Sequence, residues 1–207
     1  KEIIIVYDSE NDNAIDVAKD LSNELEDVKL VHNKIAPGVR FAVEAGVKKA
    51  NYDIILITTV DEIFPIIAID KMISNLIKND LDFLSGTRYS KGGVRLGGSL
   101  LGSIFSRVAN NLFKLLTNIP LSDCTTGMKM MKKSVWETIK LESKPIGWAF
   151  AFELSIKAYL KGLKIDEYPL KSVDRLFGGS STLKFGPWLK EYLKWFVWGV
   201  KKIKYDK

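Results

Sequence analysis

Short apolar runs alternate with helix-like segments along the N-terminal part of this chain. The apolar runs are rich in β-branched residues and span residues 3–6, 28–31, 54–57 and 83–84, and the helix-like segments span residues 14–25, 39–50 and 68–79. A continuously apolar run of about four residues fits a strand that is buried on both faces of a sheet. Strands that alternate with helices in this way are typical of βαβ units. We therefore predict an α/β fold with a mostly parallel sheet flanked by helices.

The rest of the chain has a different character. Residues 86–102 are rich in glycine and basic residues, which predicts a mobile loop. Further helices are expected at residues 104–116, from residue 133 and at 150–160, followed by a strand at 165–170 and a helix at 185–204. No internal repeat and no obvious linker interrupts the chain. We expect one domain over residues 1–184, with residues 185–207 as a basic amphipathic helix of the same domain or a membrane-surface element.

The composition excludes several kinds of site. Cys124 is the single cysteine, so no disulfide can form within the chain. His32 is the single histidine, which argues against a histidine-rich metal site or a Ser-His-Asp triad. Carboxylates would have to hold any bound metal, and carboxylates favour hard ions such as Mg2+ or Mn2+.

The formal net charge of +6 indicates an anionic partner. Phosphorylated substrates and acidic membrane surfaces fit this charge, whereas the sequence has no RNA-binding signature and no C-x-x-C pair, so we expect no nucleic acid. No apolar run reaches the roughly 20 residues that cross a bilayer, and no secretion signal is visible. Because Lys1 starts directly inside a strand-like run, we expect the natural protein to begin earlier.

Several short motifs follow one another along nearly the whole chain. They are Tyr7-Asp8-Ser9-Glu10-Asn11-Asp12, Thr59-Val60-Asp61, Ser85-Gly86-Thr87-Arg88-Tyr89, Ser106-Arg107 with Asn110, Asp123-Cys124-Thr125-Thr126-Gly127-Met128, Glu153, Gly162, Ile165-Asp166-Glu167-Tyr168-Pro169-Leu170 and Arg175-x-x-Gly178-x-Ser180. Their order and spacing resemble glycosyltransferase family 2, in its dolichol-phosphate mannose synthase-like branch. Three features depart from that pattern: the family's opening strand is absent, Thr59 replaces the first aspartate of the Asp-x-Asp metal motif, and Ser181 replaces a lysine.

The resemblance implies a GT-A-type fold and inverting sugar transfer from a GDP- or UDP-linked donor. The implied acceptor is a polyprenyl or dolichyl phosphate, at the cytoplasmic face of a membrane to which the protein binds peripherally. A transferase acting on a hydroxyl of a cell-surface glycan, which needs a general base, is the alternative enzyme. A catalytically impaired family member that acts as a binding module is the alternative outside catalysis.

The resemblance also implies residues that bind the donor. Asp61 would ligate Mg2+ or Mn2+, which stabilises the charge that develops on the leaving diphosphate. Asp8 would accept a hydrogen bond from the nucleotide base, Asp123 would orient the sugar, and Ser106 would lie near the phosphates. Asp8 and Asp123 could instead close Asx-turns, and Ser106 could cap its helix.

Basic residues are expected at the phosphate groups. The resemblance places Arg88 and Arg175 there as catalytic residues, and arginine can bind phosphate through two parallel hydrogen bonds. Lys91 and Arg95 lie on the predicted loop and could close over the acceptor phosphate. Each of these four residues could also be an ordinary surface charge.

Glu153 lies on a predicted helix with apolar residues around it. Such a setting predicts contact with the acceptor, or a catalytic base with a raised pKa. A buried pairing with Lys157 or Arg175 is the alternative.

The predicted C-terminal helix has one apolar stripe, formed by Leu189, Tyr192, Leu193, Phe196, Val200 and Ile203. Trp195 and Trp198 lie off this stripe, among lysines. Tryptophan mixed with lysine suits the surface of an acidic bilayer, so we predict that this outward side binds a membrane. Packing on the domain or on another subunit is the alternative.

Overall fold

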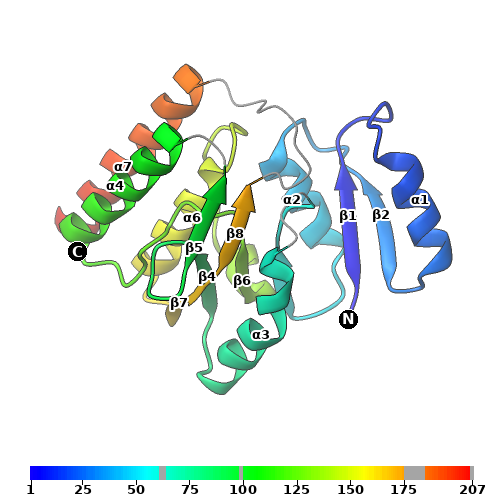
Figure 1. Ribbon diagram of the computed structural model, residues 1–207, viewed down its shortest axis with the longest axis horizontal. Coiled ribbons are helices and arrows are strands. Elements are labelled where there is room, and N and C mark those ends of the chain that lie inside the picture. The colour runs from blue at the N-terminus through cyan, green and yellow to red at the C-terminus, as the bar shows by residue number, and fades with distance from the viewer. Residues whose placement is uncertain (61–63, 98–99, 175–184, 206–207) are drawn as a thin grey trace.

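The computed structural model describes residues 1–60, 64–97, 100–174 and 185–205 (Figure 1). Its elements are β1 (Ile3–Tyr7), α1 (Ile15–Glu24), β2 (Val28–His32), α2 (Val39–Lys49), β3 (Ile54–Ile57), the 3-10 helix η1 (Phe64–Ala68), α3 (Ile69–Lys78), β4 (Phe83–Thr87), β5 (Val94–Gly97), α4 (Leu100–Thr117), β6 (Lys129–Lys132), α5 (Lys133–Thr138), α6 (Ala149–Leu160), β7 (Ile165–Pro169), β8 (Lys171–Asp174) and α7 (Phe185–Tyr205). Strands alternate with helices as far as β4, which confirms the predicted α/β class.

A mixed four-stranded sheet has the order β3-β6-β4-β7. β4 and β7 are parallel, whereas β6 runs antiparallel to both β3 and β4. β6 was not expected, because the lysines at its two ends leave only a two-residue apolar centre. β1 pairs with β2 and β5 pairs with β8, both in parallel.

The strand β5 corrects one prediction. The sequence predicts a mobile loop over residues 86–102, but Gly86 and Thr87 belong to β4, Val94–Gly97 form β5, and α4 begins at Leu100. β8 supplies the hydrogen-bond partners that β5 needs to form a strand. Because β8 lies about 75 residues further along the chain, this pairing leaves no local pattern in the glycine-rich segment.

Helix α2 and Glu2 connect β1 to the central part of the molecule. Helix α2 packs over β1, and a Cβ built on Gly46 of α2 would lie 3.0 Å from Val6 Cγ2. Glu2 accepts a hydrogen bond from the backbone N–H of Asn51 at 2.6 Å, which joins the start of β1 to the turn before β3. Figure 1 shows β1, β2 and α1 together at one end of the molecule.

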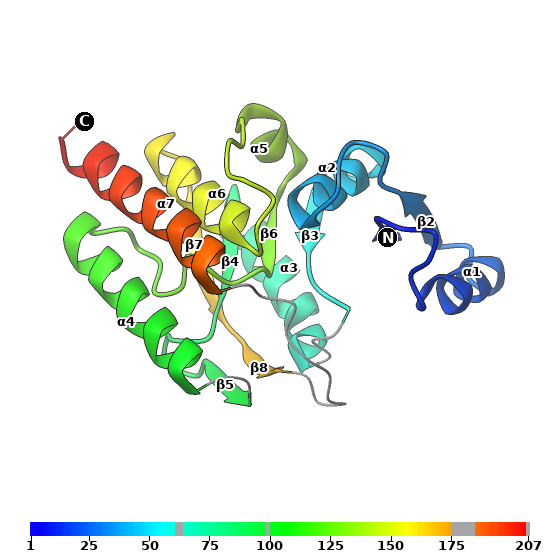
Figure 2. The ribbon, with the colours of Figure 1, turned by 90° about the horizontal axis from the view of Figure 1, so that it is seen from above.

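The main hydrophobic core includes the helices α4, α6 and α7, which lie side by side in Figure 2. The first eight residues of α6, Ala149–Ile156, are all buried. Phe113 of α4 meets Phe152 of α6 and Phe196 of α7 edge-on, with ring centroids 5.0 and 5.3 Å apart. α7 is therefore packed into the domain along one side.

The buried side of α7 differs from the predicted stripe. Trp195 is only 2% exposed, so its predicted outward position is wrong, whereas Leu193 is exposed. Gly199 explains why a different side of α7 is buried. A Cβ on Gly199 would lie 2.8 Å from Ile156 Cδ1, so α7 can approach α6 this closely only where that Cβ is missing. Glu191 accepts a hydrogen bond from the Trp195 indole N–H at 2.9 Å, which satisfies two polar groups on the buried side.

Candidate functional site

One edge of the central sheet brings Arg88 and Asp123 close to the end of β3. β3 and β4 run in the same direction, because both are antiparallel to β6. Thr59 lies just beyond β3, Arg88 directly follows β4, and Asp123 lies in the segment that leads into β6. Strand ends of this kind are where open α/β sheets bind ligands.

A buried ion pair joins the end of β4 to the turn before β6. Arg88 Nε and Nη2 donate to Asp123 Oδ2 and Oδ1 at 2.7 and 3.1 Å. The Asp123 side chain is fully buried and that of Arg88 is 12% exposed. Burial alone would raise the pKa of Asp123, but the charge and hydrogen bonds of Arg88 hold that pKa below its usual value. The ionised carboxylate fixes the plane of the guanidinium.

Asp123 also closes its own turn. Its Oδ1 accepts hydrogen bonds from the Thr125 N–H and hydroxyl and from the Thr126 N–H, over 3.0–3.2 Å. The Asx-turn that the sequence left open is therefore present together with the pairing to Arg88. Gly127 ends the turn against Trp148, since a Cβ on Gly127 would lie 2.7 Å from Trp148 Cε3.

Hydroxyl and amide groups surround the ion pair. Tyr89 OH donates to Ser106 Oγ at 2.8 Å, and Ser106 Oγ lies 3.5 Å from Thr125 Oγ1. Thr125 Oγ1 also accepts hydrogen bonds from Arg88 Nη2 at 3.2 Å and Asn110 Nδ2 at 3.0 Å. Three of the predicted site residues are thus part of one network.

Two charged residues of this region were not singled out from the sequence as site residues. Lys129 of β6 is fully buried, and its Nζ donates to Ser85 Oγ at 2.7 Å and to the Cys124 carbonyl at 3.2 Å. Burial lowers the pKa of Lys129 to about 8. Glu167 of β7 accepts hydrogen bonds from the Ser122 N–H and hydroxyl at 2.6 and 2.8 Å. Both residues hold the chain on either side of Asp123.

Asp8 follows β1 and reaches the loop between β2 and α2. Its Oδ1 accepts from Asn33 Nδ2 and its Oδ2 from the Gly38 N–H, each at 2.7 Å. Gly38 has a φ of +113°, which a glycine adopts without strain. Asp8 is exposed, so a further hydrogen bond from a ligand is sterically open to it, and its role at the nucleotide base stays a prediction.

The predicted metal ligand, Asp61, lies outside the described residues. Within the described part of the chain, no three His, Cys, Asp or Glu side chains lie together as a metal site. Thr59 Oγ1 is buried and finds no hydrogen-bond partner among the described residues. The lone pairs of that hydroxyl suit a hard divalent cation or a water bound to one, so the residues present fit Mg2+ or Mn2+.

Two of the predicted acceptor residues, Lys91 and Arg95, lie at or just before β5. Lys91 is exposed in the turn before β5, and Arg95 on β5 lies opposite Ser172 on β8. Arg175 comes directly after β8, outside the described residues. The pairing therefore places Arg95 beside β8, and the roles of these residues at a phosphate stay predictions.

Glu153 is fully buried in α6, and protein contacts engage both of its oxygens. Oε1 accepts from the Glu142 N–H at 2.7 Å and Oε2 from the Ser143 N–H at 2.8 Å. Lys157 Nζ lies 2.6 Å from Oε1, which is the pairing with Lys157 that the sequence left open. The carboxylate holds the segment before α6 in place, and its role as a catalytic base stays a prediction.

Known sequences match this chain over most of its length. A family model described as "Glycosyl transferase family 2" matches residues 1–140. The chain is 31% identical over 195 residues to "Dolichol-phosphate mannosyltransferase" of Pyrococcus furiosus, covering 93% of this chain and 53% of that protein. It is 27% identical over 124 residues to "Polyprenol monophosphomannose synthase" of Mycolicibacterium smegmatis, covering 58% and 45%. The chain spans about half the length of the curated relatives it matches.

Solved structures share the fold. Glucosyl-3-phosphoglycerate synthase from Mycobacterium tuberculosis, in complex with Mn2+, UDP-glucose and phosphoglyceric acid, matches with a TM-score of 0.71 at 14% identity, over 97% of this chain and 69% of that one. The same enzyme with Mg2+ and UDP matches with a TM-score of 0.70 at 13% identity, over 97% and 68%. The predicted GT-A-type fold is thereby confirmed.

Proposed function

Because the chain belongs to glycosyltransferase family 2, we propose that it transfers a sugar from a nucleotide-diphosphate donor to a polyprenyl phosphate, with inversion at the anomeric carbon. The observation that carries this proposal is the Arg88–Asp123 pair, which holds a guanidinium in one plane at the end of β4. Relatives named dolichol-phosphate mannosyltransferase and polyprenol monophosphomannose synthase support the lipid-linked acceptor. In this proposal the protein works peripherally at the cytoplasmic face of a membrane.

The proposed mechanism rests on stabilising negative charge. As the bond to the anomeric carbon breaks, the leaving diphosphate gains charge, which Arg175 would stabilise through bidentate hydrogen bonds and Arg88 through its positive charge. A divalent cation, when bound, would neutralise the two phosphates, with Thr59 and Asp61 as the residues that hold it. Asp8 would bind the base of the donor.

The contacts of Glu153 favour a phosphate acceptor over a glycan hydroxyl. A hydroxyl must lose its proton during attack, so a general base has to reach it. Both oxygens of Glu153 are already engaged by backbone N–H groups. A phosphate oxygen is already an anion and needs no base, and the positive charges of Lys91 and Arg95 would attract it.

Donor binding tests this function without requiring turnover. In the presence of Mn2+, a GDP- or UDP-sugar should raise the Tm of the chain, because a ligand that binds only the folded state stabilises it. Asp61→Ala should lose the Mn2+-dependent part of this shift, whereas Asp20→Ala on the exposed side of α1 should keep it. No shift with any donor would contradict the proposal and favour the binding module.

A further inference from the structure

A row of polar side chains crosses the central sheet behind the Asp123 turn. Lys129 of β6 is paired with Ser85 of β4, and Ser85 is paired with Glu167 of β7. Side chains of directly paired residues point to the same face of a sheet, so these three residues form what we call the polar row. Lys129 and Ser85 are fully buried. Removing an amine from water is unfavourable unless hydrogen bonds compensate it, so the contacts of the row indicate what it does.

Each member of the polar row holds one residue of the turn. Glu167 accepts hydrogen bonds from the N–H and the hydroxyl of Ser122 at 2.6 and 2.8 Å. Ser85 Oγ donates to the Asp123 carbonyl at 3.2 Å, and Lys129 Nζ donates to the carbonyl of the next residue, also at 3.2 Å. Lys129 Nζ donates to Ser85 Oγ as well, at 2.7 Å, which joins the row together. Three successive residues of the turn are therefore anchored from three different strands.

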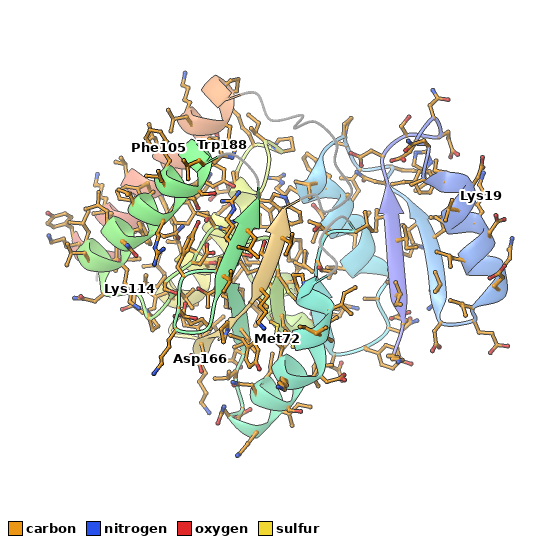
Figure 3. All side chains as sticks on the ribbon, in the orientation of Figure 1. Lys19, Met72, Phe105, Lys114, Asp166 and Trp188 are labelled. Carbon is orange, nitrogen blue, oxygen red and sulfur yellow. The ribbon has the colours of Figure 1, made fainter. Side chains whose placement is uncertain are left out.

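The opposite face of the same strands is apolar. Leu84 and Met130 alternate with the members of the polar row and join Met72 of α3, labelled in Figure 3, in a hydrophobic cluster. The row therefore faces away from α3 and toward α6. From α6, Ser155 Oγ donates to the Cys124 carbonyl at 3.1 Å, so the turn is held from this side too.

The anchored turn determines where the Arg88 guanidinium lies. The Asp123 carboxylate accepts both of its hydrogen bonds from the guanidinium within this turn. The Ser122 hydroxyl lies 2.7 Å from the Thr87 hydroxyl, and Thr87 Oγ1 accepts from the Tyr89 N–H at 3.1 Å. The residues on both sides of Arg88 and its carboxylate partner are thus connected to the polar row. A displaced turn would carry the guanidinium with it, and displacements of about 1 Å at a reacting site can cost a large part of the rate.

We propose that Lys129 is a positioning residue for the sugar transfer: through the polar row it holds the Asp123 turn, so that the Arg88 guanidinium faces the leaving diphosphate. This inference rests on the proposed function and deepens it, because it names a residue that acts through Arg88 and not on the substrate. Lys129 is the member of the row that contacts both Ser85 and the turn.

The charge of Lys129 gives this role a signature in the dependence on pH. Its amine faces Arg88 after β4, Asp123 and Cys124 in the turn, and Glu167 on β7. Burial raises the pKa of the Cys124 thiol to about 12 and lowers that of Lys129 to about 8. Among these groups the lysine therefore changes its charge near pH 8. A neutral amine donates weaker hydrogen bonds than an ammonium, so the hold on the turn should weaken above this pH.

Steady-state kinetics test the inference. Transfer is measured in detergent with a short-chain polyprenyl phosphate, and in the described part of the chain no helix is long and apolar enough to cross a membrane. Lys129→Met should lower kcat by about tenfold or more with little change in the donor KM, because Arg88 acts on charge that develops in the transition state. Lys129→Arg, which keeps a cationic donor, should recover most of the rate. The kcat of the unmodified chain should fall as the pH rises above about 8, and neither variant should show this fall.

The matched control is Lys133→Met. Lys133 follows the other end of β6, and its Nζ also donates to a backbone carbonyl, that of Ala50 at 2.8 Å. Removal of this amine should leave kcat and its pH profile unchanged, because the contact lies outside the Asp123 turn.

NMR of the Arg88 side chain provides a readout that needs no turnover. In the 15N-labelled protein, the Arg88 Nε–H signal is assigned by its absence in Arg88→Lys. Lys129→Met should speed the exchange of this proton with water by about tenfold or more, because the pair with Asp123 opens more often. Lys133→Met should leave the exchange rate unchanged. If Lys129→Met shows no cooperative thermal unfolding, Ser85→Ala removes the middle of the polar row instead and should speed the exchange in the same way.

Other outcomes overturn the inference. An unchanged kcat together with unchanged Arg88 exchange, in a folded Lys129→Met or Ser85→Ala, would show that the turn holds its place without the polar row. Parallel pH profiles of the unmodified chain and Lys129→Met would show that the ammonium does not act on the transfer. A lack of transfer by the unmodified chain would contradict the proposed function alone, because Arg88 exchange still measures whether Lys129 positions the guanidinium.

Discussion

At the residue scale, Asp123 stabilises its own turn and also pairs with Arg88 in the candidate site. Its oxygens accept hydrogen bonds from the Arg88 guanidinium and from the turn that follows. Arg88, Asp123 and Ser106 could be predicted from the sequence, because each falls in a motif of recognisable order. The contacts of Lys129 and Glu167 could not, because distant segments bury and pair them.

Asp123→Asn should destabilise the protein by about 3–5 kcal/mol, because it leaves the buried Arg88 without its counter-charge. Urea unfolding measures this loss. Combined with Arg88→Met, the double variant should be more stable than the sum of the two single losses implies. If the two losses were strictly additive, Arg88 and Asp123 would not be energetically coupled, contrary to this prediction.

Lys129 should make stability depend on pH above neutrality. Its pKa is about 8 in the folded protein, below the ordinary 10.5, so the unfolded chain binds more protons between these values. The stability of the unmodified protein relative to Lys129→Met should therefore rise from pH 8 toward pH 10, by at most about 1.4 kcal/mol per pH unit. Denaturant unfolding of both proteins across this range measures the difference. Parallel stability profiles would contradict the burial of a titrating amine.

At the scale of the elements, periodicity located the helices well but did not determine how they pack. α4 begins four residues before its predicted start, and α7 has nearly its predicted length. The buried side of α7 depends on the close approach at Gly199 and on the Glu191–Trp195 hydrogen bond. Neither interaction follows from the spacing of apolar residues.

The turn before β6 offers a test of such close contacts. Gly127→Ala should lower the free energy of unfolding by about 1–3 kcal/mol, because the new Cβ would meet three atoms of the Trp148 ring at less than 3.0 Å. Gly186→Ala is the matched control, since nothing among the described residues lies within 4 Å of its Cβ. Thermal unfolding of both variants makes the comparison. Equal stabilities would show that Trp148 does not restrict the turn.

At the scale of the whole molecule, the pairing of strands that lie far apart along the chain could not be predicted from local sequence patterns. The insertion of β6 between β3 and β4 and the β5–β8 pair both join distant segments. The same pairings bring the end of β4 next to the Asp123 turn and place Arg95 beside β8. The site is therefore a product of the sheet order, although its motifs are visible one by one.

Sugar transfer itself tests the central claim most directly. The chain is incubated with Mn2+, a GDP- or UDP-sugar and a short-chain polyprenyl phosphate, and mass spectrometry detects the glycosylated lipid phosphate. We predict product with at least one donor, and a loss of about tenfold or more in kcat/KM for Arg88→Lys, since lysine keeps the charge but not the planar fork. No product with any donor, or unchanged kinetics in Arg88→Lys, would contradict the account.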